Sequence, residues 1–412
     1  MERYFLIRLI ILIGSFGLIS PAFSQKLSFN NGHRKDKMRF ELIHNLIVIP
    51  VFVNDKGPFN FILDSGVKPL IITDSSIVSP LDTNSLFLSR IRGRGIGPEL
   101  EAYVMTNLKI DVGAASGEKL SAILLKDDPF HLSAYVGIPV HGIIGSDVFN
   151  SFMVKVNYLS KKITLYYPEV KIRKRGDRIP IQLIDEKPYV NVLVSSEDGT
   201  QDSLLLLIDS GAGHAFSLDL RDNQERIHPT KTVAGNLGKG LGGAIFGLVG
   251  RLPEIQLGEF SIKNVVVAFP MYEDDAVRSL MTERSGSIGG ELLKRFNVLF
   301  DYSRGEIYLK KNRQYRNPFE YNMSGMEVYV SNGEENDRRF FIGQIDNDTP
   351  AEEEGFMVGD EILSINFRDA SRYTLDEINN LLQEESTTGL IFQILRDDDR
   401  VLVKLLKLKR RI

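Results

Sequence analysis

The 412-residue chain contains no cysteine. This absence excludes disulfide bonds, thiolate nucleophiles, cysteine-ligated metals and lipid attachment at an N-terminal cysteine. Six histidines are present, but none lies at metal-binding spacing and no His-Glu-x-x-His sequence occurs. We therefore expect neither a metal nor another cofactor, and we expect the protein to be stabilised by apolar cores.

A strong excess of charge of one sign is also missing. The chain carries 50 basic and 54 acidic residues, which gives a formal net charge of −4. Proteins that bind nucleic acid concentrate a basic excess on one face, so nucleic acid is not an expected partner. The last basic residues are interpreted as the solvent side of a final strand and its tail: Lys404, Lys407, Lys409, Arg410 and Arg411.

Apolar runs long enough to span a bilayer are absent. The run Leu9–Ile19 follows two arginines and precedes Ala22-Phe23-Ser24, which is the order found in a secretory signal peptide. Because this run is too short to span a bilayer comfortably, we expect residues 1–24 to be cleaved after export, leaving no stable membrane anchor. The expected location is the periplasm, the cell envelope or the extracellular space. Residues 25–40, rich in Lys and Arg, are expected to form a flexible leader.

The chain contains an internal repeat. The segment Phe59–Gly66 (FNFILDSG) is echoed by Leu204–Gly211 (LLLLIDSG), and their aspartates are 145 residues apart. Glycine-rich segments downstream keep this offset, and the pairs Ile144-Gly145 with Ile288-Gly289 and Tyr158 with Tyr302 keep an offset of 144. A register held over separated landmarks indicates two homologous lobes, at residues 38–170 and 175–313.

Each lobe is predicted to be a small β-barrel. Apolar or alternating runs have the length of strands, and turn-forming residues such as Asn54-Asp55 and Asp198-Gly199 separate them. Hairpins at 152–167 and 296–310 are expected to close the two lobes.

A single Asp-Ser-Gly sequence is most simply a turn. Two copies, each ending an apolar strand at matching places in a repeat, indicate a pair of catalytic carboxyls, Asp64 and Asp209. Two carboxyls at hydrogen-bonding distance cannot both ionise, so one acts as a base toward water while the other donates a proton to a carbonyl oxygen. Glycine allows the two loops to approach closely, and serine hydroxyls can link them. The expected supporting residues are Ser65, Gly66, Ser210 and Gly211.

These motifs, together with Ile143-Ile144-Gly145 and Ser287-Ile288-Gly289, resemble the pepsin/retropepsin clan. They resemble in particular the bacterial retropepsin-like aspartyl peptidases that carry a PDZ domain. The resemblance implies a pepsin-like bilobal unit, active as a monomer, that cleaves peptide or protein substrates. It also implies that Asp64 and Asp209 bind the attacking water and that Ser65 and Ser210 grip the opposite loop. The implied tips of two substrate-covering flaps are Gly93, Gly95, Ile96 and Gly97, and Gly238, Gly240, Leu241 and Gly242; plain hairpin turns are the alternative.

Two other functions remain open. The first is a catalytically inactive protein that binds peptides in the same groove. It is favoured by Val67 and Lys68, where a small residue commonly follows the motif, and by the polar Ser287. A lysine ammonium beside Asp64 would favour the ionised carboxylate. The second is a glycosidase, which also uses paired carboxylates, but symmetric placement in a repeat favours a peptidase.

The sequence changes character near Pro318. Thr349-Pro350-Ala351-Glu352 and Thr374-Leu375-Asp376-Glu377 have the form of capping boxes that begin helices. The run TPAEEEGFMVGDEILSIN resembles the PDZ domains of bacterial envelope proteases, which implies a β domain with two helices at residues 318–412. By this resemblance the domain helps to bind peptides or protein C-termini without taking part in the chemistry, through Ser324, Gly325, Met326 and Glu327. A purely structural domain packed on the lobes is the alternative.

Overall fold

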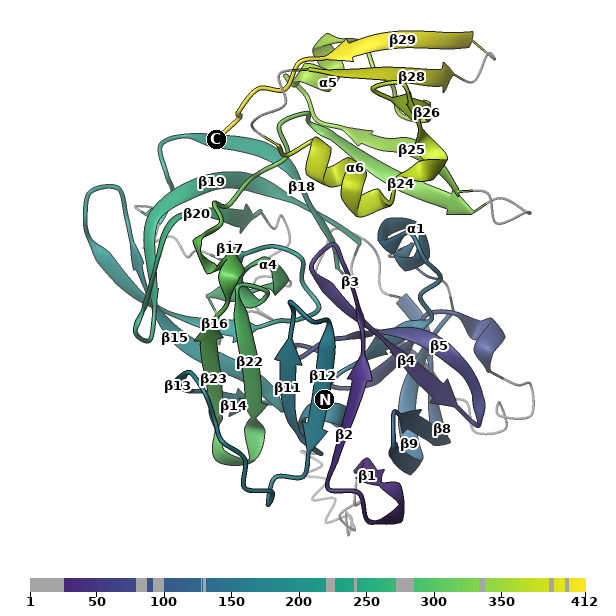
Figure 1. The fold of residues 1–412 in the computed structure, drawn as a ribbon, viewed down its shortest axis with the longest axis vertical. Helices are drawn as coiled ribbons and strands as arrows, with labels where there is room; N and C mark the ends of the chain where they lie inside the picture. The colour runs from purple at the N-terminus through teal and green to yellow at the C-terminus, as the bar shows by residue number, and fades with distance from the viewer. Residues whose placement is uncertain are drawn as a thin grey trace, which may run out of the picture.

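A computed structural model of the chain describes residues 26–78, 87–91, 100–126, 128, 131–219, 227–240, 243–271, 285–332, 338–384, 389–396 and 400–412. Within these ranges the protein is mainly β, and two of its sheets close into barrel-like rings (Figure 1). The predicted mainly β fold with barrels is therefore confirmed. The expected signal peptide lies outside the described residues. Of the helices in the described ranges, none has both the length and the apolar character needed to cross a membrane.

The first ring closes because β8 pairs with both β4 and β9. Around the ring its strands are β4 (Leu46–Val53), β5 (Lys56–Leu63), β10 (Gly142–Ile144), β6 (Leu70–Ile72), β9 (Ala115–Leu125) and β8 (Leu100–Val112). Val51 and Val53 are fully buried inside the ring whereas Phe52 between them is 38% exposed, the alternation expected of a strand with one inward face. Three short strands extend this sheet: β1 (Ser28–Phe29), β3 (Glu41–Ile43) and β7 (Phe87–Ile91).

The second ring has the same strand order and the same directions of pairing. Its strands are β15 (Lys187–Ser195), β16 (Gln201–Ile208), β21 (Gly286–Ile288), β17 (Phe216–Leu218), β20 (Phe260–Pro270) and β19 (Gly243–Leu257). In each ring the strand before an Asp-Ser-Gly loop runs parallel to the strand that ends in Ile144 or Ile288. The strands β14 (Gln182–Ile184) and β18 (Thr232–Gly240) extend this sheet as β3 and β7 extend the first.

A central sheet joins the two rings. β11 (Met153–Asn157) pairs with β22 (Phe296–Asp301) along an antiparallel seam. The remaining strands of this sheet are β12 (Lys162–Tyr166), β2 (Lys35–Arg39), β23 (Glu306–Lys311) and β13 (Asp177–Pro180). Because β2 pairs with β12 and Leu27 is only 2% exposed, the described part of residues 25–40 is an ordered part of the fold. The expectation of a flexible leader is wrong, because these residues supply an edge strand and core contacts.

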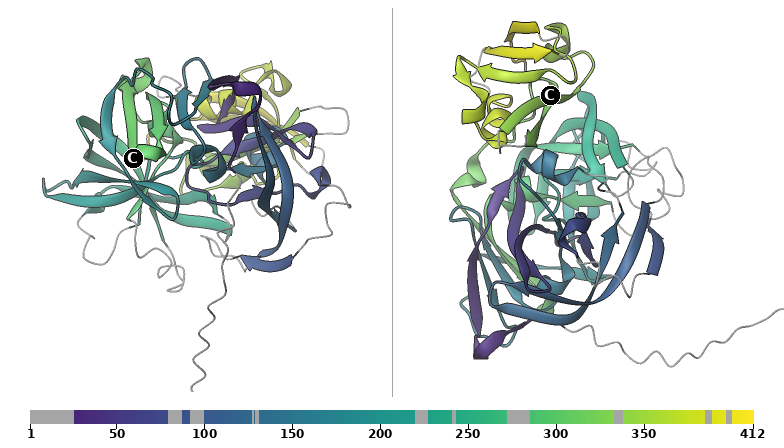
Figure 2. Two further views of the ribbon diagram at one scale, coloured as in Figure 1. Left: turned by 90° about the horizontal axis from the view of Figure 1, so that it is seen from below. Right: turned by 90° about the vertical axis from the view of Figure 1, so that its right-hand side faces the viewer.

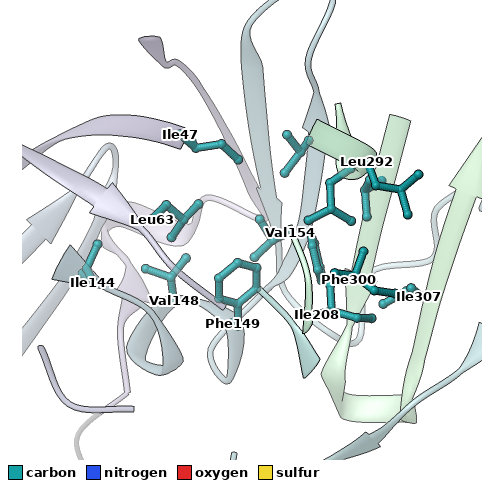
Figure 3. Packing of buried hydrophobic residues seen from close by; sticks show 14 of the residues in the cluster. Ile47, Leu63, Ile144, Val148, Phe149, Val154, Ile208, Leu292, Phe300 and Ile307 are labelled. Atoms are coloured by element: carbon teal, nitrogen blue, oxygen red, sulfur yellow. The ribbon is translucent and has the colours of Figure 1, made fainter. Parts of the chain in front are cut away.

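One apolar cluster runs through both rings and the central sheet. Figure 3 shows Leu63 and Val148 on one side of this cluster and Ile208 and Phe300 on the other. The ring of Phe149, at the end of α2 (Ser146–Phe149), packs edge-on against Phe300 with centroids 5.0 Å apart. The matching helix of the second ring is α4 (Gly290–Leu293), and α1 (Leu132–Val136) belongs to the first. A shared core of this kind holds the two rings in one fixed relation.

The C-terminal sheet has an apolar cluster of its own and caps one end of the molecule (Figures 1 and 2). The capping box at Thr374 is formed as predicted. At Thr349 it is not formed, because the Thr349 hydroxyl donates to the Asp346 carbonyl and the Glu352 carboxylate accepts from the Asp348 amide. The elements are β24 (Met326–Asn332), β25 (Arg338–Ile345), α5 (Pro350–Glu353), β26 (Glu361–Ile365), β27 (Arg368–Asp369), α6 (Leu375–Leu381), β28 (Leu390–Arg396) and β29 (Arg400–Leu406).

Part of the C-terminal tail is docked: Lys407 and Lys409 are exposed, as the sequence suggested, but Arg411 and Ile412 are held against the fold. The Arg411 guanidinium lies 2.9 Å from the Asp346 carboxylate and its side chain is only 8% exposed. The Arg410 guanidinium lies 3.1 Å from the Glu320 carboxylate, and Ile412 is buried. The sequence does not reveal these ion pairs, because Asp346 and Glu320 lie far from the basic residues along the chain.

Candidate active site

The two Asp-Ser-Gly loops occupy matching places in the two rings. Asp64 follows β5 directly and Asp209 follows β16 directly. The Asp64 amide donates to the Ile144 carbonyl at 2.9 Å, and the Asp209 amide donates to the Ile288 carbonyl at 2.8 Å. Each aspartate is thus held at the end of a buried parallel strand pair, and both side chains are partly exposed.

Ser65 and Ser210 link the loops by four crossed hydrogen bonds. The Ser65 hydroxyl donates to the Ile208 carbonyl at 2.7 Å and accepts from the Ser210 amide at 3.0 Å. The Ser210 hydroxyl donates to the Leu63 carbonyl at 2.8 Å and accepts from the Ser65 amide at 3.0 Å. Both serines are buried, so these bonds form away from competing water and fix the separation of the two loops.

The two glycines of these loops lie against the opposite carboxyl. A Cβ at Gly211 would lie 2.2 Å from the Asp64 Cγ, and one at Gly66 would lie 3.2 Å from the Asp209 Cγ. Each glycine amide also donates to the carboxylate of its own loop, Gly66 to Asp64 at 2.6 Å and Gly211 to Asp209 at 3.1 Å. The closeness of the loops leaves no room for a side chain at Gly211 and little room for one at Gly66.

The carboxyl of Asp64 is held in its protonated form to a higher pH than usual. Burial and the neighbouring Asp209 carboxyl, which is also within hydrogen-bonding reach, raise the pKa of Asp64 well above its ordinary value. The Gly66 amide and the more distant Lys187 oppose this shift. Burial, and then the charges of Asp64 and Asp209, also raise the pKa of the Tyr302 hydroxyl. A pair of carboxyls that shares a proton in this way can act as acid and base together.

The Lys68 and Ser287 side chains are each engaged by residues outside the aspartate pair. The Lys68 ammonium lies 2.8 Å from Asp185 and 3.4 Å from Glu186, and the pKa of Asp64 is raised by its burial and by Asp209. The expectation that Lys68 would favour an ionised Asp64 is therefore wrong, because the lysine is engaged across the junction of the rings. Ser287 is buried, and its hydroxyl lies 2.9 Å from the His214 Nε2.

The remaining predicted site residues lie elsewhere. Gly238 and Gly240 are on β18, and Gly240 pairs with Gly243 of β19, so the second glycine-rich segment belongs to a long hairpin. Ser324 and Gly325 precede β24, and Met326 and Glu327 begin it. The first glycine-rich segment, Gly93, Gly95, Ile96 and Gly97, and the tip residues Leu241 and Gly242 lie outside the described residues.

Sequence reasoning missed two hairpin tips that reach across to the opposite ring. His44 and Asn45 connect β3 to β4, and Asp185 and Glu186 connect β14 to β15; all four have positive φ. The Asn45 side-chain amide (Nδ2) donates to the Gly213 carbonyl at 2.8 Å, and Asp185 pairs with Lys68. The sequence offered one clue to these tips, which is their position: each directly precedes the first strand of a ring.

Comparison of the sequence with protein-family models and with curated proteins finds no match.

We expect Ser65→Ala to lower the free energy of unfolding by about 3 kcal/mol. The substitution leaves the buried Ile208 carbonyl and Ser210 amide without their partner, and each such group costs roughly 1–3 kcal/mol. Urea unfolding measures the loss. Ser203→Ala, at an exposed position of β16, is the control and should stay within about 0.5 kcal/mol of the unsubstituted protein. Equal losses in both variants would contradict the role of the crossed bonds.

The contacts around Gly211 and Gly66 predict that alanine lowers the free energy of unfolding by different amounts at the two positions. Gly211→Ala should destabilise the protein by about 3 kcal/mol, because its Cβ would overlap the Asp64 carboxyl. Gly66→Ala should lower the free energy of unfolding by about 1 kcal/mol or less. Its Cβ would lie 3.2 Å from the Asp209 Cγ, and a small shift of the neighbouring groups relieves that contact. Thermal or urea unfolding of the two variants compares them directly, and a greater loss for Gly66→Ala would contradict the asymmetry.

The raised pKa of Asp64 predicts how stability depends on pH. Above an unfolded-state pKa of about 3.9 the unfolded chain releases this proton while the folded protein retains it. Stability therefore falls as pH rises through this window, by about 1.4 kcal/mol per pH unit, until the folded pKa is passed. Asp64→Asn lacks this titration, so its stability relative to the unsubstituted protein should rise over the same window. Urea unfolding between about pH 3 and pH 8 measures it; a difference that does not vary with pH would contradict the prediction.

Proposed function

We propose that the protein is an aspartic endopeptidase in which Asp64 and Asp209 activate a water molecule. The observation that carries this proposal is the pair of carboxyls on matching loops, linked by the crossed Ser65 and Ser210 hydrogen bonds. The equal strand order of the two rings supports the finer proposal of two homologous lobes of the pepsin/retropepsin type. The C-terminal sheet with α5 and α6 corresponds in this proposal to a PDZ-type domain.

The proposed reaction is hydrolysis of a peptide bond without a covalent intermediate. Asp209 accepts a proton from a water molecule, whose oxygen attacks the carbonyl carbon, and Asp64 donates its proton to the carbonyl oxygen. Asp209 then gives the proton that it took from water to the amide nitrogen, the carbon–nitrogen bond breaks, and Asp64 takes back a proton from one hydroxyl of the intermediate. This releases an acid and an amine and restores the pair. Asp64 is suited to the acid role because its burial and the adjacent Asp209 carboxyl raise its pKa.

Both carboxyls of the pair come from one chain, so we propose that the protein acts as a monomer. The proposed flaps are the hairpin of β18 and β19 and the glycine-rich segment near Gly95. The signal-like N-terminus supports export, and the proposed substrates are peptides or proteins outside the cytoplasm.

Asp64→Asn and Asp209→Asn should each reduce peptide hydrolysis by at least about a thousandfold, since each deletes an acid–base group and keeps the size of the side chain. The measurement is cleavage of a peptide library by the purified mature protein. Asp55→Asn is a matched control, because the Asp55 side chain is 72% exposed on a turn of the first ring, and it should cleave normally.

A statine-type transition-state analogue separates the outcomes of this experiment. Inhibition of cleavage by the analogue supports the proposal. Binding of the analogue by an unsubstituted protein that cleaves no peptide would overturn it in favour of a non-catalytic peptide-binding protein. Normal cleavage by either Asp→Asn variant would show that the pair does not perform the chemistry.

A further inference from the structure

Helix α6 of the C-terminal sheet contacts the β3–β4 hairpin tip of the first ring. The His44 amide donates to the Asp376 carboxylate at 3.1 Å. The Asn379 amide nitrogen lies 3.3 Å from the His44 Nε2, and the His44 ring packs on the Tyr135 ring of α1 with centroids 4.7 Å apart. The tip, consisting of His44 and Asn45, is thus held by the C-terminal sheet although it belongs to the first ring.

The same tip also packs against the backbone of the second ring. Asn45 donates to the Gly213 carbonyl at 2.8 Å and accepts from the Lys294 ammonium at 2.8 Å. A Cβ at Gly213 would lie 2.7 Å from the His44 carbonyl oxygen, and one at Gly290 would lie 2.1 Å from the Asn45 carbonyl oxygen. The contact is therefore backbone against backbone, and a shift of the tip would displace residues 213 and 290 directly.

Gly213 lies two residues beyond the second Asp-Ser-Gly motif. The Gly290 amide donates to the Ala212 carbonyl at 2.7 Å, and the Ala212 amide donates to the Asp209 carbonyl at 3.4 Å. The path from α6 to Asp209 thus runs through one hairpin tip and one short loop. Each step is a hydrogen bond or a close backbone contact, and the Asp376 and Asn45 side chains supply two of the hydrogen bonds that hold the tip.

The equivalent tip of the second ring is supported differently. Its residues Asp185 and Glu186 reach Lys68 and Asn150 of the first ring through side chains. The Asp185 and Lys68 side chains are 63% and 44% exposed, so this contact is screened by solvent. Only the tip beside the second loop contacts the C-terminal sheet in the described part of the chain.

The loop before β24 is held by hydrogen bonds of its own. The Ser324 and Gly325 amides donate to the Asn322 side-chain oxygen at 2.9 and 3.0 Å, and the Met326 amide donates to the Ser324 hydroxyl at 3.1 Å. These amides, expected to capture a peptide carboxylate, are already satisfied within the chain.

The first ring packs against the β24 side of the C-terminal sheet. Helix α1 packs against β24, as Figure 1 also shows. A Cβ at Gly137, just after α1, would lie 3.5 Å from both Val330 and Leu375. Asn236 of β18 donates to Gln344 of β25 at 2.8 Å, so the second ring is held as well. The sheet is thereby attached to both rings.

We propose that Asp376 is a positioning residue for the reaction, and that the C-terminal sheet supports the second catalytic loop through the His44–Asn45 tip. This inference rests on the proposed peptidase function. Asp376 does not touch the substrate; its carboxylate fixes the tip, and the tip fixes residues 209–213. The sheet then contributes to the turnover of every substrate, including short peptides that have no C-terminal recognition.

The test compares Asp376→Ala, Asp376→Asn and Asn380→Ala in the full chain, using a short internal peptide as substrate. Asp376→Ala should lower kcat about tenfold with little change in KM, because small displacements of a catalytic group lower turnover strongly. Asp376→Asn keeps an oxygen that accepts from the His44 amide and should restore most of the rate. Asn380→Ala, exposed on the same helix, should behave as the unsubstituted protein.

Hydrogen exchange at residues 209–213 gives a second readout that needs no activity. Asp376→Ala should accelerate exchange of these amides, whereas Asn380→Ala should not. Asn45→Ala should reproduce both effects, and combining it with Asp376→Ala should add little, since both act through one tip. Unchanged kcat and unchanged exchange in Asp376→Ala and Asn45→Ala would overturn the inference.

The two readouts also separate this inference from the proposed function. If the unsubstituted protein cleaves no peptide, the peptidase proposal fails, and exchange at residues 209–213 alone then decides whether Asp376 holds the loop. If cleavage occurs but a rise in KM is the only effect of Asp376→Ala, the sheet acts in substrate binding and the positioning role is refuted.

Discussion

The rest of the site depends on the crossed hydrogen bonds between Ser65 and Ser210. Each hydroxyl both donates to and accepts from the backbone of the opposite loop, at 2.7 to 3.0 Å. Because both side chains are buried, breaking one bond would leave unpaired groups away from water. The bonds hold two loops from different rings at one fixed separation, and the proximity of Asp64 to Asp209 follows from that separation.

The close approach of the loops determines the electrostatics of the pair. Two carboxyls brought together while partly removed from water cannot both ionise, and the pKa of Asp64 is raised by its burial and by Asp209. The two loops are nevertheless unequal. Gly211 lies tightly against Asp64 while Gly66 has more room beside Asp209, so the twofold relation of the rings is only approximate at the proposed reacting groups.

This asymmetry extends to the supports outside the loops. On one side a hairpin tip meets its neighbour through exposed charged side chains, at Lys68 and Asp185. On the other side the His44–Asn45 tip meets backbone at Gly213 and Gly290 and is held in turn by α6. A domain that the sequence suggests as an accessory for peptide binding is thus placed where it supports one half of the proposed site. Binding a peptide and supporting the second Asp-Ser-Gly loop are different roles for the C-terminal sheet, because only support of the loop affects the turnover of every substrate.

The sequence alone was sufficient for features that depend on local interactions or on the repeat. The apolar strands before Asp64 and Asp209, the turn-forming Asp-Ser-Gly residues and the capping box at Thr374 are each encoded within a few residues, and the constant offset indicated that the two loops are equivalent. The tertiary structure alone revealed the partners of Lys68, of the His44–Asn45 tip and of the Arg411 tail. These contacts join residues 65 to 335 positions apart, and a charged or polar side chain carries no local pattern that identifies a distant partner. The partner is decided only when the strands have closed into rings and the rings have packed on one another.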